Sequence, residues 1–158
     1  GVLAGVIACL AVLPPRLAFS YDGPPVPGPT ELSDLVTATM LAVDAGNKSG
    51  SYAALHAMGG QDFQAAYPAE KLAGLFATLR ASNLDLAILK DKVPLTSRPP
   101  TLDGNGRLRI LGYYELPAKQ LVYDVLYDYD PAGRRWTLAA ISVKDRPLPP
   151  QPDLMQPQ

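Results

Sequence analysis

Few side chains in this sequence have the chemistry that catalysis requires. His56 is the only histidine and Cys9 the only cysteine, and Cys9 lies in an apolar segment at the start of the chain. A nucleophilic Ser–His or Cys–His pair would therefore depend on His56 alone. The count excludes a metal site with two histidine ligands, and no spacing of Asp and Glu resembles a calcium loop. We expect no metal, no cofactor and no nucleophilic catalysis, and interpret His56 as a partly buried helix residue.

Aromatic residues with polar tips are better candidates for a binding site. Tyr113, Tyr114, Tyr123, Tyr127 and Trp136 occur where apolar and polar residues alternate along the chain. Rings that carry a hydroxyl or an indole N–H can line a ligand pocket or anchor a partner protein. The same residue types are common in β-strands, so packing within a sheet is the alternative interpretation.

The charges of the chain do not indicate an electrostatic partner. Fourteen Lys and Arg nearly balance fifteen Asp and Glu, the net charge is −1, and no run of one sign occurs. Nucleic-acid binding depends on basic clusters, so we expect no nucleic-acid partner. The glycines of residues 103–106 precede a predicted strand and no Lys-Ser or Lys-Thr follows them, which indicates a turn rather than a phosphate-binding loop.

The first thirteen residues form an uncharged apolar segment that Pro14 and Pro15 close. Its length matches the apolar region of a secretion signal better than the roughly 20 residues of a membrane span. Small residues at Ala18 and Ser20 would allow cleavage before Tyr21. A retained segment would instead contact the membrane through its larger apolar side chains: Val2, Leu3, Val6, Ile7, Leu10, Val12 and Leu13.

Cys9 adds a third interpretation of this segment. Val6-Ile7-Ala8-Cys9 resembles the lipobox of bacterial lipoproteins, whose cysteine is acylated, although residues 10–13 are apolar where a lipoprotein usually turns polar. The alternative is that Cys9 is a small residue in an apolar helix.

Prolines divide the rest of the chain. Six of the seventeen lie between Pro14 and Pro29, and five lie between Pro147 and Pro157. Such flanks favour an extended polyproline II conformation and act as semi-rigid spacers. We expect four parts: an apolar signal sequence or anchor at residues 1–20, a Pro-rich tether at 21–29, one folded domain at 30–146 and an extended Pro-rich tail at 147–158.

Helical periodicity dominates the first half of the domain, and strand patterns follow after Asn83. The sequence predicts three helices: residues 31–45 between Thr30 and Gly46, residues 52–58 before Gly59, and residues 68–81 from Pro68 onward. It predicts three strands joined by turns: residues 107–116, 120–129 and 136–143. We therefore expect an α+β fold with three N-terminal helices packed on a curved antiparallel sheet.

This order of elements resembles the nuclear-transport-factor-2-like, or ketosteroid-isomerase-like, α+β cone over about residues 31–145. The resemblance rests on the helix end Asp44-Ala-Gly46, the short helix Tyr52-Ala-Ala-Leu-His56, the helix start Pro68-Ala-Glu70 and the hairpin from Tyr129 to Leu138. It implies a sheet folded around the first helix with a cavity between them. The fold hosts enzymes, binders and structural subunits alike.

An isomerase-like enzyme would need an acid inside the cone. Asp124, with Tyr114 or Tyr123, would supply the base and the hydrogen-bond donors that the resemblance implies. The alternation of β-strand side chains places Asp124 on the face opposite the tyrosines, which argues against this activity.

These observations favour a non-catalytic accessory subunit of a bacterial membrane complex, with a periplasmic domain anchored in the inner membrane by residues 1–13. Its partners would be other subunits of that complex. The alternative is a soluble periplasmic protein, cleaved near Ser20, that binds a small apolar ligand. An isomerase-like enzyme is the third hypothesis.

Overall fold

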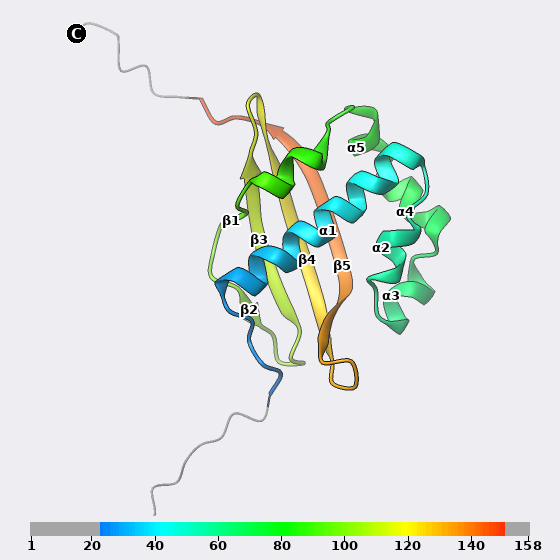
Figure 1. The fold of residues 1–158 in the computed structure, drawn as a ribbon, viewed down its shortest axis with the longest axis vertical. Coiled ribbons are helices and arrows are strands. Elements are labelled where there is room, and N and C mark those ends of the chain that lie inside the picture. The colour runs from blue at the N-terminus through cyan, green and yellow to red at the C-terminus, as the bar shows by residue number, and fades with distance from the viewer. Residues whose placement is uncertain (1–22, 151–158) are drawn as a thin grey trace, which may run out of the picture.

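The computed structural model describes residues 23–150 (Figure 1). The predicted leader at 1–20, including Cys9 and the anchoring side chains, lies outside the described residues, and so does the tail beyond Pro150. Within residues 23–150, no helix combines the length and the apolar character that crossing a bilayer requires.

The domain is α+β, as predicted, with helices on one face of an open antiparallel sheet. The strand order is β1-β3-β4-β5, and β2 pairs with β3 next to the end that begins at Leu108. Figure 1 shows α1 lying diagonally across the sheet, with the shorter helices α2, α3 and α4 beyond the edge formed by β5. The strands are β1 (Leu95–Thr96), β2 (Thr101–Leu102), β3 (Leu108–Glu115), β4 (Lys119–Asp130) and β5 (Arg135–Pro147).

The first helix, α1 (Pro29–Ser49), is longer than predicted at both ends. Thr30 lies inside it rather than at its cap, because Pro29 occupies the first turn, where a missing N–H costs nothing. Gly46 does not end it either. Gly46 is buried, and a Cβ there would overlap the ring of Tyr52, so this glycine permits close packing. The helix ends at Gly50, whose φ of 78° is the left-handed conformation of a C-terminal cap.

The predicted third helix over residues 68–81 is wrong in detail, because two helices occupy it. Phe76, with φ −96° and ψ 7°, separates α4 from α5 and stacks on Tyr52 at 5.4 Å between ring centroids. Two further helical segments, α3 and η1, were not predicted. The segments after α1 are α2 (Ala53–Ala57), α3 (Gln61–Ala66), α4 (Ala69–Leu75), α5 (Ala77–Ala81) and the 3₁₀ helix η1 (Leu86–Asp91).

The three long strands match their predicted positions to within a few residues. Along β4, buried and half-exposed residues alternate from Leu121 to Asp128, which confirms the period-2 pattern of the sequence. The inner face packs against α1. Among residues 23–150, no helix covers the opposite face, called here the outer face (Figure 1). The sheet therefore has one buried side and one partly exposed side.

Candidate functional site

Four tyrosines fill the space between the helices and the sheet. Tyr114 comes from β3 and Tyr123 and Tyr127 come from β4, while Tyr52 precedes α2. All four are fully buried, and the rings of Tyr114 and Tyr123 lie 5.7 Å apart. The alternation of strand residues brings Tyr114, Tyr123 and Tyr127 to the inner face together, as the sequence suggested.

The chain itself satisfies the hydroxyls of the three strand tyrosines. Thr39 donates to the carbonyl of Leu35 at 2.8 Å, so its oxygen accepts the proton of the Tyr127 hydroxyl at 2.7 Å. Tyr114 bonds the Thr37 hydroxyl at 2.9 Å, and Tyr123 donates to the carbonyl of Leu95 at 2.9 Å. These bonds tie α1 and β1 to the sheet.

Burial raises the pKa of Tyr114, Tyr123 and Tyr127 above the ordinary value of 10. These phenols therefore stay neutral at physiological pH and act as hydrogen-bonding groups rather than as bases. Their arrangement is that of a packed polar core, in which each buried hydroxyl has its partner.

The other two aromatic candidates lie elsewhere. Tyr113 is half-exposed on the outer face, with the guanidinium of Arg146 5.9 Å from its ring centroid. Trp136 is half-buried at the start of β5 and packs against Tyr129 at 5.1 Å. The structure thus brings three of the five candidate residues together and leaves Tyr113 and Trp136 apart from them.

Asp124 points away from the tyrosines. Both of its carboxylate oxygens accept from Arg109, at 3.0 and 2.6 Å, on the outer face. The hydrogen bonds from Arg109 hold the pKa of Asp124 below its ordinary value. The prediction that Asp124 lies opposite the tyrosines is confirmed, so it is not placed to act as a base inside the fold.

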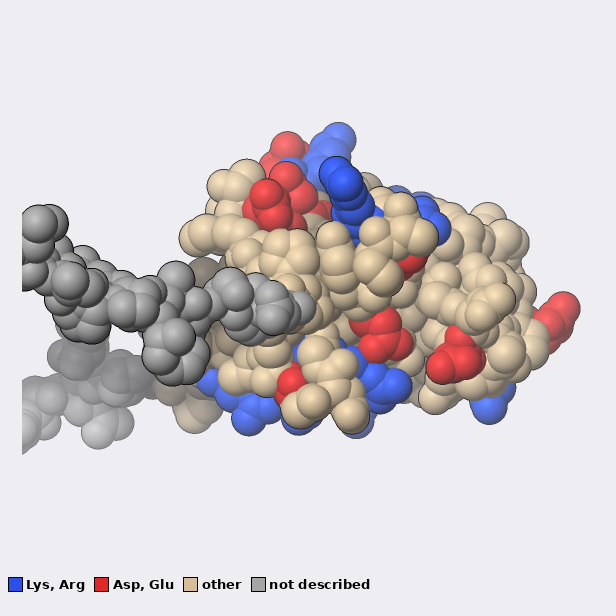
Figure 2. All heavy atoms as spheres, turned by 90° about the horizontal axis from the view of Figure 1, so that it is seen from below, with Lys and Arg blue, Asp and Glu red and all other residues tan. Residues whose placement is uncertain are grey.

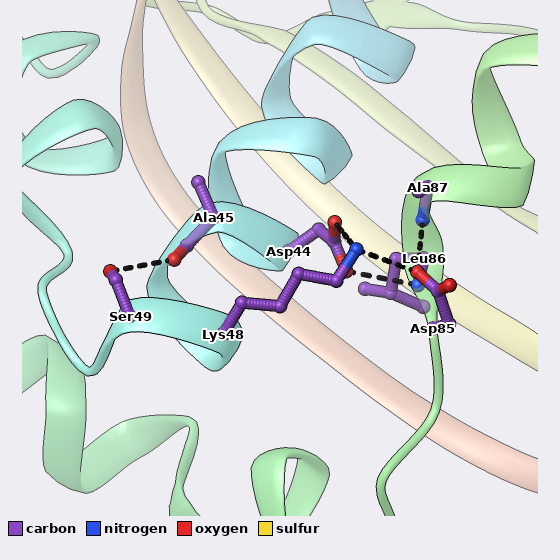
Figure 3. A network of polar contacts seen from close by, with 7 residues as sticks. All are labelled: Asp44, Ala45, Lys48, Ser49, Asp85, Leu86 and Ala87. Carbon is purple, nitrogen blue, oxygen red and sulfur yellow. Dashed lines mark hydrogen bonds and ion pairs between the residues drawn. The ribbon is translucent and has the colours of Figure 1, made fainter.

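Asp44 is the one buried carboxylate among the described residues, and both of its oxygens have partners. Its oxygens accept from the backbone N–H of Leu86 at 3.0 Å and from Lys48 at 2.8 Å (Figure 3). Lys48 also pairs with Asp85 at 2.7 Å. Asp85 accepts from the backbone N–H of Ala87, and Lys48 and this N–H lower its pKa. The network joins α1 to the start of η1, so its role is structural.

His56 lies half-buried in α2, where its Nε2 is 3.1 Å from the carbonyl oxygen of Gln64. The side chain of Gln64 donates back to the carbonyl of His56 at 3.1 Å. This reciprocal pair joins α2 to α3.

An apolar cleft opens between the N-terminal half of α1 and the segment 93–100. Its volume is about 310 Å³, and Tyr123 and Ile110 form part of its wall. On its rim, Val93 is 72% exposed. The sequence did not indicate this cleft, because no helix or strand was predicted over residues 93–100 and the pattern Val93-Pro94 gives no sign of where this loop packs. Its other lining residues are Pro29, Leu32, Ser33, Val36, Pro94, Thr96 and Pro100.

The charged groups are mixed over the surface. In the view of Figure 2, Lys and Arg lie next to Asp and Glu, and most of the visible surface carries neither. On the outer face, Arg107 pairs with Asp128 at 2.9 Å, as Arg109 pairs with Asp124. Within residues 23–150, no three His, Cys, Asp or Glu side chains gather in a way that could hold a metal ion.

Comparison of the chain with protein-family models, with characterised proteins and with solved structures finds no match. The resemblance to the cone superfamily therefore stays a prediction from the order of elements.

Proposed function

We propose that this protein is a non-catalytic accessory subunit of a membrane complex, whose folded domain works by binding other subunits. The observation that carries the proposal is the filled interior. Tyr114, Tyr123 and Tyr127 fill the space between α1 and the sheet, where the predicted resemblance implies a cavity, and their hydroxyls are bonded to the chain. A buried polar core of this kind fixes one structure and leaves no reactive group exposed to a substrate.

The positions of the carboxylates support the same proposal. Asp124 is paired with Arg109 on the outer face, and Asp44 is committed to Lys48 and the backbone of Leu86. A general base needs a free carboxylate within reach of a substrate proton. Neither of these acids meets that condition, so their positions favour a binding function over acid–base catalysis.

The test is purification of the full chain, carrying a C-terminal affinity tag, from membranes solubilised in a mild detergent. We expect partner subunits to elute in a fixed ratio to the tagged protein. A chain in which residues 1–20 are replaced by a cleavable secretion signal is the matched control, because it keeps the domain and removes the anchor. Elution of the full chain alone would contradict the proposal.

The apolar cleft supports a second candidate function, the binding of a small apolar ligand. Its volume of about 310 Å³ is near the lower end of the range for small-molecule sites, and Leu32, Val36 and Ile110 give it an apolar wall. Val93 stands at its rim and is 72% exposed, so it can be changed without disturbing the core.

A matched pair of variants tests this candidate. Val93→Asp places a charge at the cleft, whereas Val26→Asp places one at a residue that is 57% exposed and does not line it. If the cleft binds ligand, medium-chain fatty acids should raise the melting temperature of the delipidated wild type and of Val26→Asp, but not of Val93→Asp. Equal responses in the two variants would remove the candidate.

A further inference from the structure

One edge of the sheet is formed by β5. This strand pairs with β4 on one side, and α2, α3 and α4 lie beyond its other side (Figure 1). The N–H and C=O groups on the outer side of an edge strand have no neighbouring strand to satisfy them, so they can pair with another chain.

The hydrogen bonds of the sheet show which β5 residues turn their backbone groups to this edge. At the β3–β4 hairpin the N–H of Leu116 donates to the carbonyl of Lys119 at 2.9 Å. Odd-numbered residues of β4 therefore face β3, and even-numbered ones face β5. From Ala140 onward, their partners in β5 are also even-numbered. The backbone groups of Ile141 and Val143 consequently point to the free edge.

The chain itself pairs with only the first part of this edge. Before the bulge in β5, the N–H of Leu138 donates to the carbonyl of Met58 at 2.8 Å, and the carbonyl of Leu138 accepts from Gly60 at 3.2 Å. After the bulge, no residue within 23–150 bonds the outward backbone groups of Ile141 and Val143. These groups recur about every 6.8 Å, the length of two residues in a strand. Their spacing is that of an extended backbone.

A groove of about 400 Å³ lies beside this part of the edge, lined on one side by residues 141–145. Its other wall comes from the region of α4 and α5, and Phe76 and Leu79 are buried there. Leu75 stands on this wall with 54% of its surface exposed, although it is a large apolar residue. The groove thus combines unpaired backbone groups on one side with apolar side chains on the other.

We propose that the β5 edge at residues 141–145 and this groove bind an extended segment of a partner subunit, which adds to the sheet as a further strand. The backbone of the segment pairs with Ile141 and Val143, and its alternate apolar side chains pack against Leu75. This inference rests on the proposed accessory function and deepens it, because it names the surface and the kind of segment that a partner supplies.

The helices beside the edge favour a single strand over a second copy of this domain. A second β5 would bring its own helices with it, and α2, α3 and α4 already lie beyond this edge (Figure 1). A lone strand needs only the strand-to-strand spacing of about 4.8 Å beside β5. The groove therefore suits a segment that arrives without a folded domain around it.

The experiment measures amide hydrogen exchange in the full chain, purified in detergent, with and without the blocked peptide Glu-Thr-Val-Thr-Val-Thr-Val-Glu. At saturation, exchange at the amides of Ile141 and Val143 should slow at least about tenfold. The amides of Ser142 and Lys144 face β4 and should not change. The control peptide Glu-Val-Val-Val-Thr-Thr-Thr-Glu has the same composition without the alternation, and should bind at least about tenfold more weakly.

A matched pair of variants tests the groove wall. Leu75→Asp places a charge in the groove and should weaken binding of the alternating peptide at least about tenfold. Ile88→Asp makes the same kind of change at an apolar residue of η1 that is 40% exposed and does not line the groove, so it should bind as the wild type does. Melting temperatures within about 2 °C of wild type would show that both variants remain folded.

Unchanged exchange at Ile141 and Val143 in about 1 mM peptide would overturn the inference. Equal binding of the two peptides, or equal binding by Leu75→Asp and the wild type, would also overturn it. Protection of these two amides in the concentrated chain without peptide would place a second copy at the edge and contradict the proposal. The readout uses no native partner, so a failure here is distinguishable from a failure of the membrane purification.

Discussion

The hydrogen bond between Tyr127 and Thr39 offers a direct test of whether the interior of this domain is packed. Both side chains have 0% exposure, and the Tyr127 hydroxyl donates to Thr39 across 2.7 Å. Tyr127→Phe removes one buried hydrogen bond and should cost about 1 kcal/mol. Thr39→Val leaves the Tyr127 hydroxyl buried without its acceptor and should cost about 1–3 kcal/mol.

The double variant Tyr127→Phe/Thr39→Val removes both partners, so no polar group is left without one at this contact. Its cost should be well below the sum of the two single costs, with a coupling energy of about 1–2 kcal/mol. The loss of the bond from Thr39 to Leu35 contributes little, because such bonds to the preceding helical turn are close to neutral.

Urea unfolding at 25 °C measures these free energies, followed by the fluorescence of Trp136, the only tryptophan. Tyr113→Phe is the control, since Tyr113 lies half-exposed on the outer face, and it should change stability by less than about 0.5 kcal/mol. Additive single costs, within about 0.3 kcal/mol, would refute the reasoning. They would mean that water or a ligand satisfies these hydroxyls and that the interior is open.

Three further predictions concern the packing of β3, the contacts between α1 and η1, and the outer face of the sheet. Gly112→Ala should lower the free energy of unfolding, measured in urea, by about 1–3 kcal/mol, because a Cβ there would overlap the carbonyl of Leu95 and the hydroxyl of Tyr123. The control is Gly74→Ala, which should be neutral or stabilising because its Cβ would meet nothing within 4 Å. Asp44→Ala should lower the free energy of unfolding by about 1–3 kcal/mol and speed hydrogen exchange at the amide of Leu86, which loses its acceptor. Unchanged exchange would contradict the assignment of Asp44 as the residue that joins α1 to η1. The folded pKa of Asp124 lies below 3.8, so its pairing with Arg109 stabilises the fold fully above pH 3.8 and is lost as the pH falls through the folded pKa. Asp124→Asn should flatten the acid limb of a stability–pH curve, and a curve of wild-type shape would count against this pair.

Much of the sheet was predictable from the sequence, because its signals are local. Alternation along β4 places Tyr123 and Tyr127 on one face and Asp124 on the other, and this requires only the period of two residues in a strand. The turn at residues 103–106 also follows from local chemistry, since the Asp103 side chain accepts from the backbone N–H groups of Asn105 and Arg107.

The helical half was harder to predict, because tertiary contacts override the local signals there. Gly46 has the sequence signature of a helix end, yet it lies inside α1 to make room for the ring of Tyr52. Phe76 continues a helical pattern, yet its stacking on Tyr52 accompanies a break between α4 and α5. Both cases depend on a residue elsewhere in the chain, which no local pattern contains.

The candidate site was predictable only in part. Composition and alternation brought Tyr114, Tyr123 and Tyr127 together, but their hydrogen-bond partners Thr37, Thr39 and Leu95 come from α1 and β1, whose packing the sequence does not specify. The apolar cleft forms where residues 93–100 fold back beside α1, and it was missed for the same reason.

The accessory-subunit proposal depends most directly on the state in which the protein exists in the cell. The decisive measurement is the intact mass of the protein, together with that of everything that co-elutes with it, after purification from detergent-solubilised membranes. We predict a chain that retains residues 1–20 and elutes with partner subunits in fixed ratio. A lone chain beginning at Tyr21, recovered without detergent, would contradict the proposal.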